Sequence, residues 1–212
     1  MIEYKNISVI YRGEELFGKL NLEIKRNSKV LIVGKSGYGK STLFSILLGF
    51  YKPDSGDVLF NNEKITEENI WEIRKKIAYV DQSVSLQNLT VAEWFDYVAS
   101  LKANKSIDFS KKRILEKFNF FQLDEKIFNE KIDLLSGGEK QRLALITAIL
   151  LNREIYLLDE PTSALDNKLK KIVVEYFSSF ENKTIIVISH DDIWLNQTSF
   201  NVFDLENKKW VR

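Results

Sequence analysis

The sequence of 212 residues contains no cysteine, and that absence excludes two kinds of site. Without cysteine the chain forms no disulfide and binds no metal through thiolate sulfur, so a metal ion is expected on oxygen ligands. A chain without disulfides also fits a reducing compartment.

Long hydrophobic runs and an excess of one charge are missing as well. The longest apolar runs, residues 43–50 and 143–151, are shorter than the roughly 20 residues that a membrane-spanning helix needs. The first residues lack a charged segment followed by an apolar core, so no signal peptide is expected. Lys and Arg number 31 against 30 Asp and Glu, and the net charge of +1 provides no general attraction for nucleic acid or an anionic membrane. No nucleic-acid partner is expected.

What the chain does have is alternating strand and helix patterns. Residues 4–11 and 16–24 alternate as strands, and the apolar run 29–34 ends in glycine before a helical pattern begins. Two further apolar runs, 154–159 and 184–190, are typical of buried parallel strands. These patterns predict an α/β core preceded by an antiparallel β region.

The middle of the chain follows a different pattern. From residue 83 to about residue 135 the apolar residues repeat at helical spacing. Examples are Val91, Trp94, Phe95, Val98 and Leu101. The sequence therefore predicts one domain over 1–212, in which 1–83 and 136–212 form the core and 84–135 form an inserted helical subdomain.

Residues 34–42, GKSGYGKST, match the pattern of a phosphate-binding loop. In this pattern glycines free backbone N–H groups that converge on phosphate oxygens at a helix N-terminus, which predicts a P-loop NTPase core. Lys40 would neutralise the β- and γ-phosphates, and Ser41 would bind Mg²⁺. A glycine-rich turn without nucleotide is disfavoured by the place of the motif between a buried strand and a helix. The predicted loop residues are Gly34, Lys35, Ser36, Gly37, Tyr38, Gly39, Lys40, Ser41 and Thr42.

Two carboxylates end the strand pattern at 154–159. Asp159 is expected to hold hydrated Mg²⁺, because a phosphate loop needs a carboxylate at the end of a neighbouring strand. Glu160 can polarise the attacking water of a hydrolase. Paired acids after a strand more often form a helix cap or a solvated turn, but the phosphate loop upstream makes that alternative the weaker one.

Three further side chains are predicted at the same edge of the sheet. His190, the single histidine, ends a strand pattern, and a hydrogen bond to the γ-phosphate is favoured over a structural role. Gln82 follows another strand and can reach Mg²⁺ or the attacking water. Tyr11 can stack on adenine, although a partly buried strand tyrosine explains it nearly as well.

A second glycine cluster begins a helix within DLLSGGEKQR, residues 133–142. Ser136 and Glu139 satisfy a capping box, which is the structural alternative. That alternative leaves Gly137 and Gly138 unexplained, because each glycine costs a helix roughly 1 kcal/mol against alanine. Close approach of a phosphate to bare N–H groups is the favoured reason. One compact chain cannot wrap one triphosphate from both sides, so these glycines predict a two-fold dimer in which each cluster faces the ATP of the other copy.

In this order the motifs resemble the ATP-binding cassette (ABC) domain over essentially the whole chain. The resemblance rests on GKSGYGKST, Gln82, LSGGEKQ, IYLLDE, SALD at 163–166 and His190. Each motif is weak or moderate alone, whereas the ordered set is very specific.

The resemblance implies ATP and Mg²⁺ as cofactors and a role for each matching residue. Around the nucleotide, Tyr11 would stack on adenine, residues 34–42 would bind the phosphates, and His190 would sense the γ-phosphate. Asp159 would bind Mg²⁺, Glu160 would be catalytic, and Gln82 would couple the nucleotide to a membrane partner. At the dimer interface, where Asp166 would lie, Ser136, Gly137 and Gly138 would contact the opposite subunit's ATP.

Two positions depart from the family pattern. Asp81 stands where members often have proline, which puts the movement of the Gln82 loop in doubt. Tyr38 replaces a usually small residue and is expected to point away from the phosphates. Neither change removes a catalytic group.

The expected function is an ATPase subunit that dimerises around two ATP molecules and drives a separate membrane-spanning permease from the cytoplasmic face of the membrane. A soluble ABC ATPase of translation or DNA maintenance is the alternative, but such relatives usually carry two cassettes or a long coiled-coil insertion. A GTPase is disfavoured because the chain has no Asn-Lys-x-Asp motif. The segment 70–94 slightly favours export over import.

Overall fold

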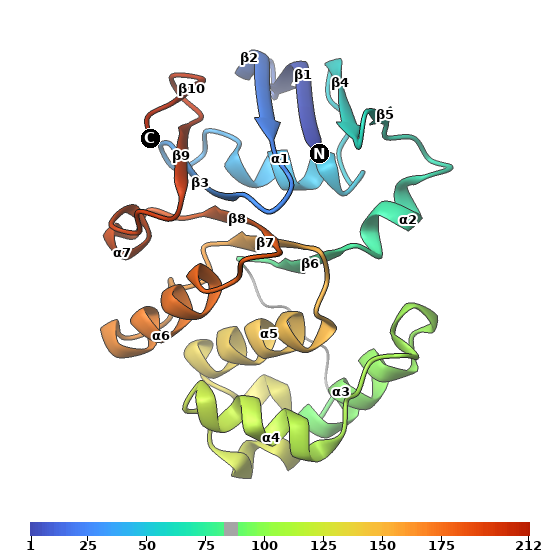
Figure 1. The fold of residues 1–212 in the computed structure, drawn as a ribbon, viewed down its shortest axis with the longest axis vertical. Helices are drawn as coiled ribbons and strands as arrows, with labels where there is room; N and C mark the ends of the chain where they lie inside the picture. The colour runs from blue at the N-terminus through green and yellow to red at the C-terminus, as the bar shows by residue number, and fades with distance from the viewer. Residues whose placement is uncertain (83–88) are drawn as a thin grey trace.

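The computed structural model describes residues 1–82 and 89–212, and it contains two β-sheets (Figure 1). The first sheet is antiparallel and has the strand order β2-β1-β4-β5. Its strands are β1 (Ile2–Tyr11), β2 (Glu14–Ile24), β4 (Ser55–Phe60) and β5 (Glu63–Lys64). Inward and outward side chains alternate along β2, which explains the alternating sequence pattern there.

The second sheet has the order β10-β9-β3-β8-β7-β6 and is parallel except at its β10 edge. Its strands are β3 (Lys29–Val33), β6 (Ile77–Val80), β7 (Ile155–Asp159), β8 (Thr184–Ile188), β9 (Asn201–Asp204) and β10 (Lys209–Trp210). Every residue of β7 and β8 is buried, which is why both read as uninterrupted apolar runs.

Helices cover both faces of this parallel sheet (Figure 1). Helix α1 (Lys40–Leu47) and the antiparallel sheet lie on one face, while α5 (Gly137–Leu151) and α6 (Asn167–Ser178) lie on the other. The alternation of β3 shows the division, because Val30 and Ile32 belong to the core around α1 and Leu31 belongs to the core around α5. Two short helices, α2 (Ile70–Arg74) and α7 (Asp192–Leu195), complete the core region.

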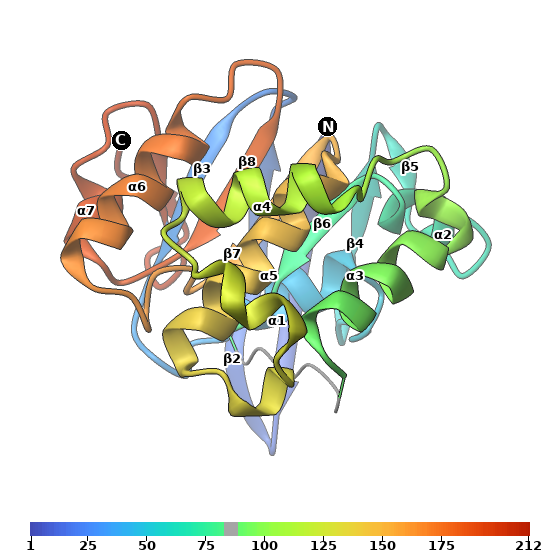
Figure 2. The same ribbon diagram turned by 90° about the horizontal axis from the view of Figure 1, so that it is seen from below.

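The elements between residues 89 and 135 are helical and gather beside α5 (Figure 2). They are α3 (Val91–Ser100), η1 (Lys102–Asn104), α4 (Lys111–Phe120), η2 (Glu125–Asn129) and η3 (Ile132–Leu134). Val91, Phe95 and Val98 are buried as their spacing predicts. Leu101 is not, because α3 ends at Ser100 and the chain turns extended, which leaves Leu101 41% exposed.

The predicted α/β fold class, with its antiparallel β region and helical insertion, is confirmed. The predicted boundary between core and subdomain at 83/84, and subdomain residues 84–88, lie outside the described residues. Among the helices that the structure describes, none has the length and apolar character needed to cross a bilayer.

Candidate active site

A cleft of about 340 Å³ lies where the parallel strands end. The loop after β3, the end of β7 and the residue pairs after β6 and β8 meet there, because the carboxyl ends of parallel strands share one edge of a sheet. Its lining residues are Tyr11, Leu16, Ser36, Gly37, Gly39, Lys40, Ser41, Thr42, Gln82, Asp159, Glu160, Ile188 and His190. The structure therefore brings together all the predicted catalytic and metal-binding residues.

The phosphate-binding loop ends in a helix start that lacks a cap. Gly39 is the N-cap of α1 with φ 81°, and no side chain accepts a hydrogen bond from the first turn of α1. Only glycine fits there, since its φ is in the left-handed region and a Cβ would lie 2.7 Å from Cε1 of Phe17. The N–H groups of Thr42 and Leu43 donate to the carbonyl of Gly39 at 3.0 and 3.3 Å, whereas those of Lys40 and Ser41, at the positive end of the helix, have no such bond among the described residues and can meet an anion.

Lys40 turns its ammonium group toward the protein backbone. Its Nζ donates to the carbonyl oxygens of Gly34 and Lys35 at 2.8 and 2.9 Å, and it lies 2.9 Å from Nε2 of His190. Burial lowers the pKa of Lys40, and the charges of Glu160 and Asp159 oppose that shift. The cation of the cleft is therefore held in place by three partners of its own chain.

Asp159 is buried, and within residues 1–82 and 89–212 neither of its carboxylate oxygens has a hydrogen-bond partner. Burial raises its pKa to about 6, while the nearby Ser41 hydroxyl and the Lys40 charge favour the ionised form. A buried carboxylate with unsatisfied oxygens, beside a hydroxyl and a cleft, fits a hard cation such as Mg²⁺. In the described residues no three His, Asp or Glu side chains form a metal cage, and Mg²⁺ commonly takes only one or two carboxylates together with water and phosphate.

Glu160 leaves β7 in a left-handed turn with φ 47°. Its N–H still donates to the carbonyl of Ile188 at 2.8 Å, which continues the pairing of β7 with β8. The turned side chain is 14% exposed and brings Oε1 to 3.6 Å from Nε2 of His190, which is half exposed. A carboxylate and an imidazole therefore face the same cleft, next to Lys40.

Tyr11 and Gln82 stand at the mouth of the cleft and are both exposed. Tyr11 is the last residue of β1 and is 52% exposed. The guanidinium of Arg12 lies 5.3 Å from the centroid of its ring. An exposed ring at a cleft mouth can stack on a flat base.

Three predicted loop residues do not line the cleft. Gly34 forms the start of the loop, and the exposed Lys35 pairs with Glu206 at 2.7 Å. Tyr38 packs against the core around α1, as expected for a side chain that points away from the phosphates.

The second glycine cluster lies outside the cleft. Ser136 caps α5, since its Oγ accepts from the N–H of Glu139 at 3.3 Å and the Glu139 carboxylate accepts from the N–H of Ser136 at 2.8 Å. Asp166 is also outside, and its side chain accepts from the N–H of Leu169 at 2.8 Å as the cap of α6. The structure of one chain thus leaves Ser136, Gly137, Gly138 and Asp166 apart from the other predicted site residues.

At Gly138 the structure adds a reason for glycine within the same chain, beside the predicted contact with a partner's phosphate. A Cβ on Gly138 would lie 2.9 Å from the carbonyl oxygen of Ala164, so this glycine allows the loop after β7 to pack on α5. At Gly137 a Cβ would meet only the Cβ of Ala164, at 3.8 Å, which is an ordinary contact. Only Gly137 therefore lacks a reason within its own chain.

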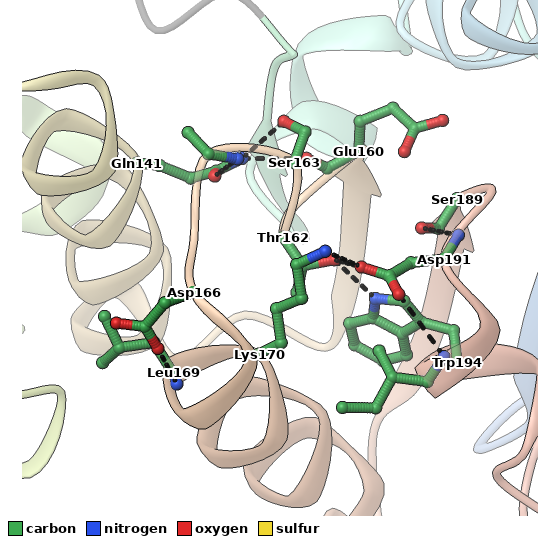
Figure 3. Close-up of polar contacts among 12 residues, drawn as sticks. Gln141, Glu160, Thr162, Ser163, Asp166, Leu169, Lys170, Ser189, Asp191 and Trp194 are labelled. Atoms are coloured by element: carbon green, nitrogen blue, oxygen red, sulfur yellow. Dashed lines mark hydrogen bonds and ion pairs between the residues drawn. The ribbon is translucent and has the colours of Figure 1, made fainter.

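Two hydrogen-bond networks near Glu160 were not predicted from the sequence motifs (Figure 3). In the first, the buried Gln141 of α5 reaches the loop after β7. In the second, Asp191 accepts from Lys170 at 2.5 Å and from the Thr162 hydroxyl at 3.4 Å. Gln141 lies within the predicted DLLSGGEKQR segment, but the loop that it contacts lies about twenty residues later. Leu16 and Ile188 also line the cleft and carried no motif signal.

Comparison with known proteins gives a family match over most of the chain. The family model described as ABC transporter matches residues 17–163. The uncharacterized ABC transporter ATP-binding protein MJ0796 of Methanocaldococcus jannaschii is 34% identical over 209 residues, which cover 90% of this chain and 87% of that protein. Its dimeric post-hydrolysis structure bound to ADP and Pi has a TM-score of 0.84 at 31% identity and covers 100% of this chain and 97% of the other.

Two other relatives differ in length and in the direction of transport that their names give. A probable sulfate/thiosulfate import ATP-binding protein, CysA, of Chlorella vulgaris is 33% identical, over 98% of this chain and 88% of that protein. A putative export ATP-binding/permease protein, RT0691, of Rickettsia typhi is 35% identical over 89% of this chain, but the match spans only 34% of that protein.

Proposed function

The chain belongs to the ABC transporter family and is an ATP-hydrolysing subunit of that family, and from this premise we propose which residues carry the reaction and what the chain assembles with. The observation that carries the proposal is the cleft itself. Lys40, Asp159, Glu160 and His190 converge there from three strand ends, beside a helix start whose N–H groups are uncapped. Binding and hydrolysis of a nucleoside triphosphate require such a set of phosphate-binding, metal-binding and water-activating groups.

We propose that residues 34–42 bind the phosphates and that Tyr11 stacks on adenine. The free N–H groups at the start of α1 favour a phosphate at the positive helix end. Lys40 would then exchange its carbonyl partners for phosphate oxygens, which are the stronger acceptors because they are charged. Binding is thus expected to open the intrachain contacts of Lys40.

We propose that Ser41, Asp159 and Gln82 hold Mg²⁺, which when bound supplies charge neutralisation for the transferred phosphoryl group. Of these residues Asp159 carries most of the argument, because its carboxylate is buried and has no hydrogen-bond partner of its own. Its pKa of about 6 means that the carboxylate is ionised at neutral pH even before a cation is present.

Glu160 and His190 are proposed to act in the same hydrolysis step, Glu160 on the attacking water and His190 on the γ-phosphate. Glu160 would orient and deprotonate water, and His190 would donate a hydrogen bond to the γ-phosphate. Two distances support these roles: Glu160 Oε1 lies 3.6 Å from Nε2 of His190, and Lys40 Nζ lies 2.9 Å from the same nitrogen. A base at that position can contribute about 10²- to 10⁴-fold in rate.

A second copy of the chain is proposed to complete each site. Residues 136–138 and Asp166 lie outside the cleft and are exposed or half-exposed, so another copy can reach them. The solved dimer of the relative bound to ADP and Pi supports this arrangement. We propose that Ser136, Gly137 and Gly138 contact the ATP of the opposite copy, across a two-fold axis.

A separate membrane-spanning permease is proposed as the further partner, contacted through Gln82 and the helical subdomain 84–135. This contact would place the chain at the cytoplasmic face of a membrane. Transport is favoured over a soluble role in translation or DNA maintenance, because the relatives carry transport names. Those names include both an importer and an exporter, so the slight preference for export stays a prediction.

Replacement of Glu160 by Gln tests the assignment of the base. ATP turnover is expected to fall by roughly 10²- to 10⁴-fold while ATP binding persists and an ATP-bound dimer accumulates. Steady-state phosphate release and light scattering measure the two effects. The control is Glu154→Gln, which makes the same change at the opposite end of β7 and should leave turnover unchanged. Undiminished turnover in Glu160→Gln would contradict the proposal.

A further inference from the structure

The side chain of Gln141 is buried, with 2% exposure, and all of its polar groups are used. Its Nε2 donates to the carbonyl oxygen of Glu160 at 2.8 Å and, more weakly, to Oγ of Ser163 at 3.4 Å. Its Oε1 accepts from the N–H of Ala164 at 2.8 Å. One carboxamide therefore bridges both ends of the turn that follows the catalytic glutamate (Figure 3).

That turn begins with a backbone conformation that is uncommon for a glutamate. Glu160 has φ 47°, in the left-handed region, where a residue with a Cβ is strained. Such a conformation persists only where the surrounding structure fixes it. Here the N–H of Glu160 is held by Ile188 on the sheet side, and its carbonyl is held by Gln141 on the α5 side.

A second contact on the same face of α5, at Gly138, also holds the turn formed by residues 160–164. Gly138 lies three residues before Gln141, and residues at this spacing share a helix face. The missing side chain at Gly138 gives the carbonyl of Ala164 room to approach, and Gln141 then receives the N–H of Ala164. Helix α5 therefore provides both the space and the hydrogen bonds that fix residues 160–164.

We propose that Gln141 is a positioning residue for Glu160, fixing the strained backbone that turns the Glu160 carboxylate into the cleft. Gln141 does not itself line the cleft. Loss of its bridge leaves Glu160 free to relax toward an unstrained φ, and the carboxylate then leaves its place beside His190. This inference rests on the proposed role of Glu160 as the base.

The simpler alternative is that Gln141 only satisfies buried backbone groups and contributes stability. The two interpretations predict that different quantities change in a Gln141 variant. Loss of general stability lowers the amount of active protein, whereas displacement of the base lowers kcat of the folded protein and leaves the KM for ATP largely unchanged. They differ again in a chain that lacks the Glu160 carboxylate, where a positioning residue has nothing left to position.

The first experiment compares Gln141→Met with Gln122→Glu and with wild type. Methionine keeps the length of the side chain and removes both hydrogen-bonding groups, while Gln122 is exposed and remote from the cleft. Gln141→Met is expected to lower kcat by roughly 10- to 100-fold, the scale of a displaced catalytic group, with KM within about threefold. Gln122→Glu should match wild type. In a Glu160→Gln background, Gln141→Met should cause no further loss of residual turnover.

The second experiment uses Gln141→Glu, which keeps the shape and makes the bridge depend on pH. When ionised, the introduced carboxyl faces the Glu160 carbonyl without a donor, and when protonated it can donate to that carbonyl and accept from Ala164. The ratio of its kcat to that of wild type should therefore rise as pH is lowered from about 8 to about 6, since burial raises the pKa of a carboxyl. This variant also decides the case if Gln141→Met fails to fold.

Three results would overturn the proposal. They are an unchanged kcat in folded Gln141→Met, a loss expressed only in KM, and a loss that adds fully to that of Glu160→Gln. A pH-independent ratio for Gln141→Glu has the same meaning. If Glu160→Gln itself keeps full turnover, the assignment of the base has failed instead, so the two failures are distinguishable.

Discussion

Helices α1 and α5 both begin beside glycines, yet their first turns are built in opposite ways. The start of α1 has glycine as its N-cap and no side-chain cap, and it opens into the cleft. The start of α5 is closed by the Ser136–Glu139 capping box and lies on the surface. Glycines at a helix start therefore do not by themselves define an anion site. What distinguishes α1 is that no side chain of the described residues caps its first turn and that Lys40 and Asp159 line the cleft beside that turn.

The carboxylates near the two turns differ in the same way. Burial, aided by the charges of Asp81 and Glu160, raises the pKa of Asp159 to about 6, although Ser41 and Lys40 oppose the shift. Hydrogen bonds from the hydroxyl and N–H of Ser136 hold the pKa of Glu139 below its usual range. The cleft keeps an unsatisfied charge for a ligand, whereas the α5 turn has already used its charge for its own stability.

The largest expected effect comes from the charge in the cleft. Since the folded-state pKa of Asp159 lies above its ordinary value of 3.8, its contribution to stability is full below about pH 4 and is lost as pH rises through about 6. Asp159→Asn should therefore raise the free energy of unfolding of the nucleotide-free chain at pH 8 by roughly 1–3 kcal/mol. The gain should vanish near pH 4. Thermal unfolding in the presence of a chelator measures it.

Glu139→Gln is expected to change stability at pH 8 in the opposite direction from Asp159→Asn. The lowered pKa of Glu139 favours folding above its unfolded-state pKa, and this contribution is lost as pH falls through the folded-state value. This variant should therefore be less stable than wild type at pH 8, with the difference closing in acid. If Asp159→Asn and Glu139→Gln shift stability in the same direction at pH 8, the contrast between the two turns is wrong.

The two glycines of the α5 turn should respond to alanine with opposite signs. Gly138→Ala places a Cβ 2.9 Å from the Ala164 carbonyl, so a loss of about 1–3 kcal/mol is expected from overpacking. Gly137→Ala has room and a better helix former, so a gain of about 0.5–1 kcal/mol is expected. Urea unfolding of both variants checks the pair. Equal losses would mean that both glycines serve the fold alone.

The smallest effect separates the two interpretations of Ser136. Ser136→Ala should cost about 1 kcal/mol of stability through the lost cap, and Thr90→Ala should cost the same, since Thr90 and Glu93 form a matching capping box on α3. If the Ser136 hydroxyl also meets the partner's ATP, only Ser136→Ala lowers ATP turnover beyond its loss of stability. Equal turnover in both variants would leave Ser136 as a cap alone.

Local patterns explain why so much of the cleft could be predicted from the sequence. The strand, glycine turn and helix around residues 34–42 are contiguous, and Asp159 and His190 each follow an apolar run that ends at one edge of the sheet. Parallel pairing then brings them together without further information. The same reasoning located Gln82 and Glu160 in the cleft.

Contacts between distant segments could not be predicted in this way. The bridge from Gln141 to Ala164 and the close approach at Gly138 depend on how the loop after β7 lies on α5, and no spacing within either segment encodes it. The pairing of Lys35 with Glu206 joins residues 171 positions apart. Tyr11 fits both an exposed and a partly buried strand position by pattern, and only the structure shows it exposed.

The single histidine makes the cleft directly observable by NMR. A lysine ammonium can only donate, so the 2.9 Å contact of Lys40 Nζ with Nε2 of His190 corresponds to the tautomer that has its ring proton on Nδ1. If ATP draws Lys40 onto its phosphates and accepts from Nε2–H, that proton moves to the other nitrogen. Because the chain has one imidazole, the ¹⁵N resonances of a ¹⁵N-enriched sample report this tautomer change without any need to distinguish it from other histidines. The protein therefore carries its own spectroscopic signal for the occupancy of the cleft.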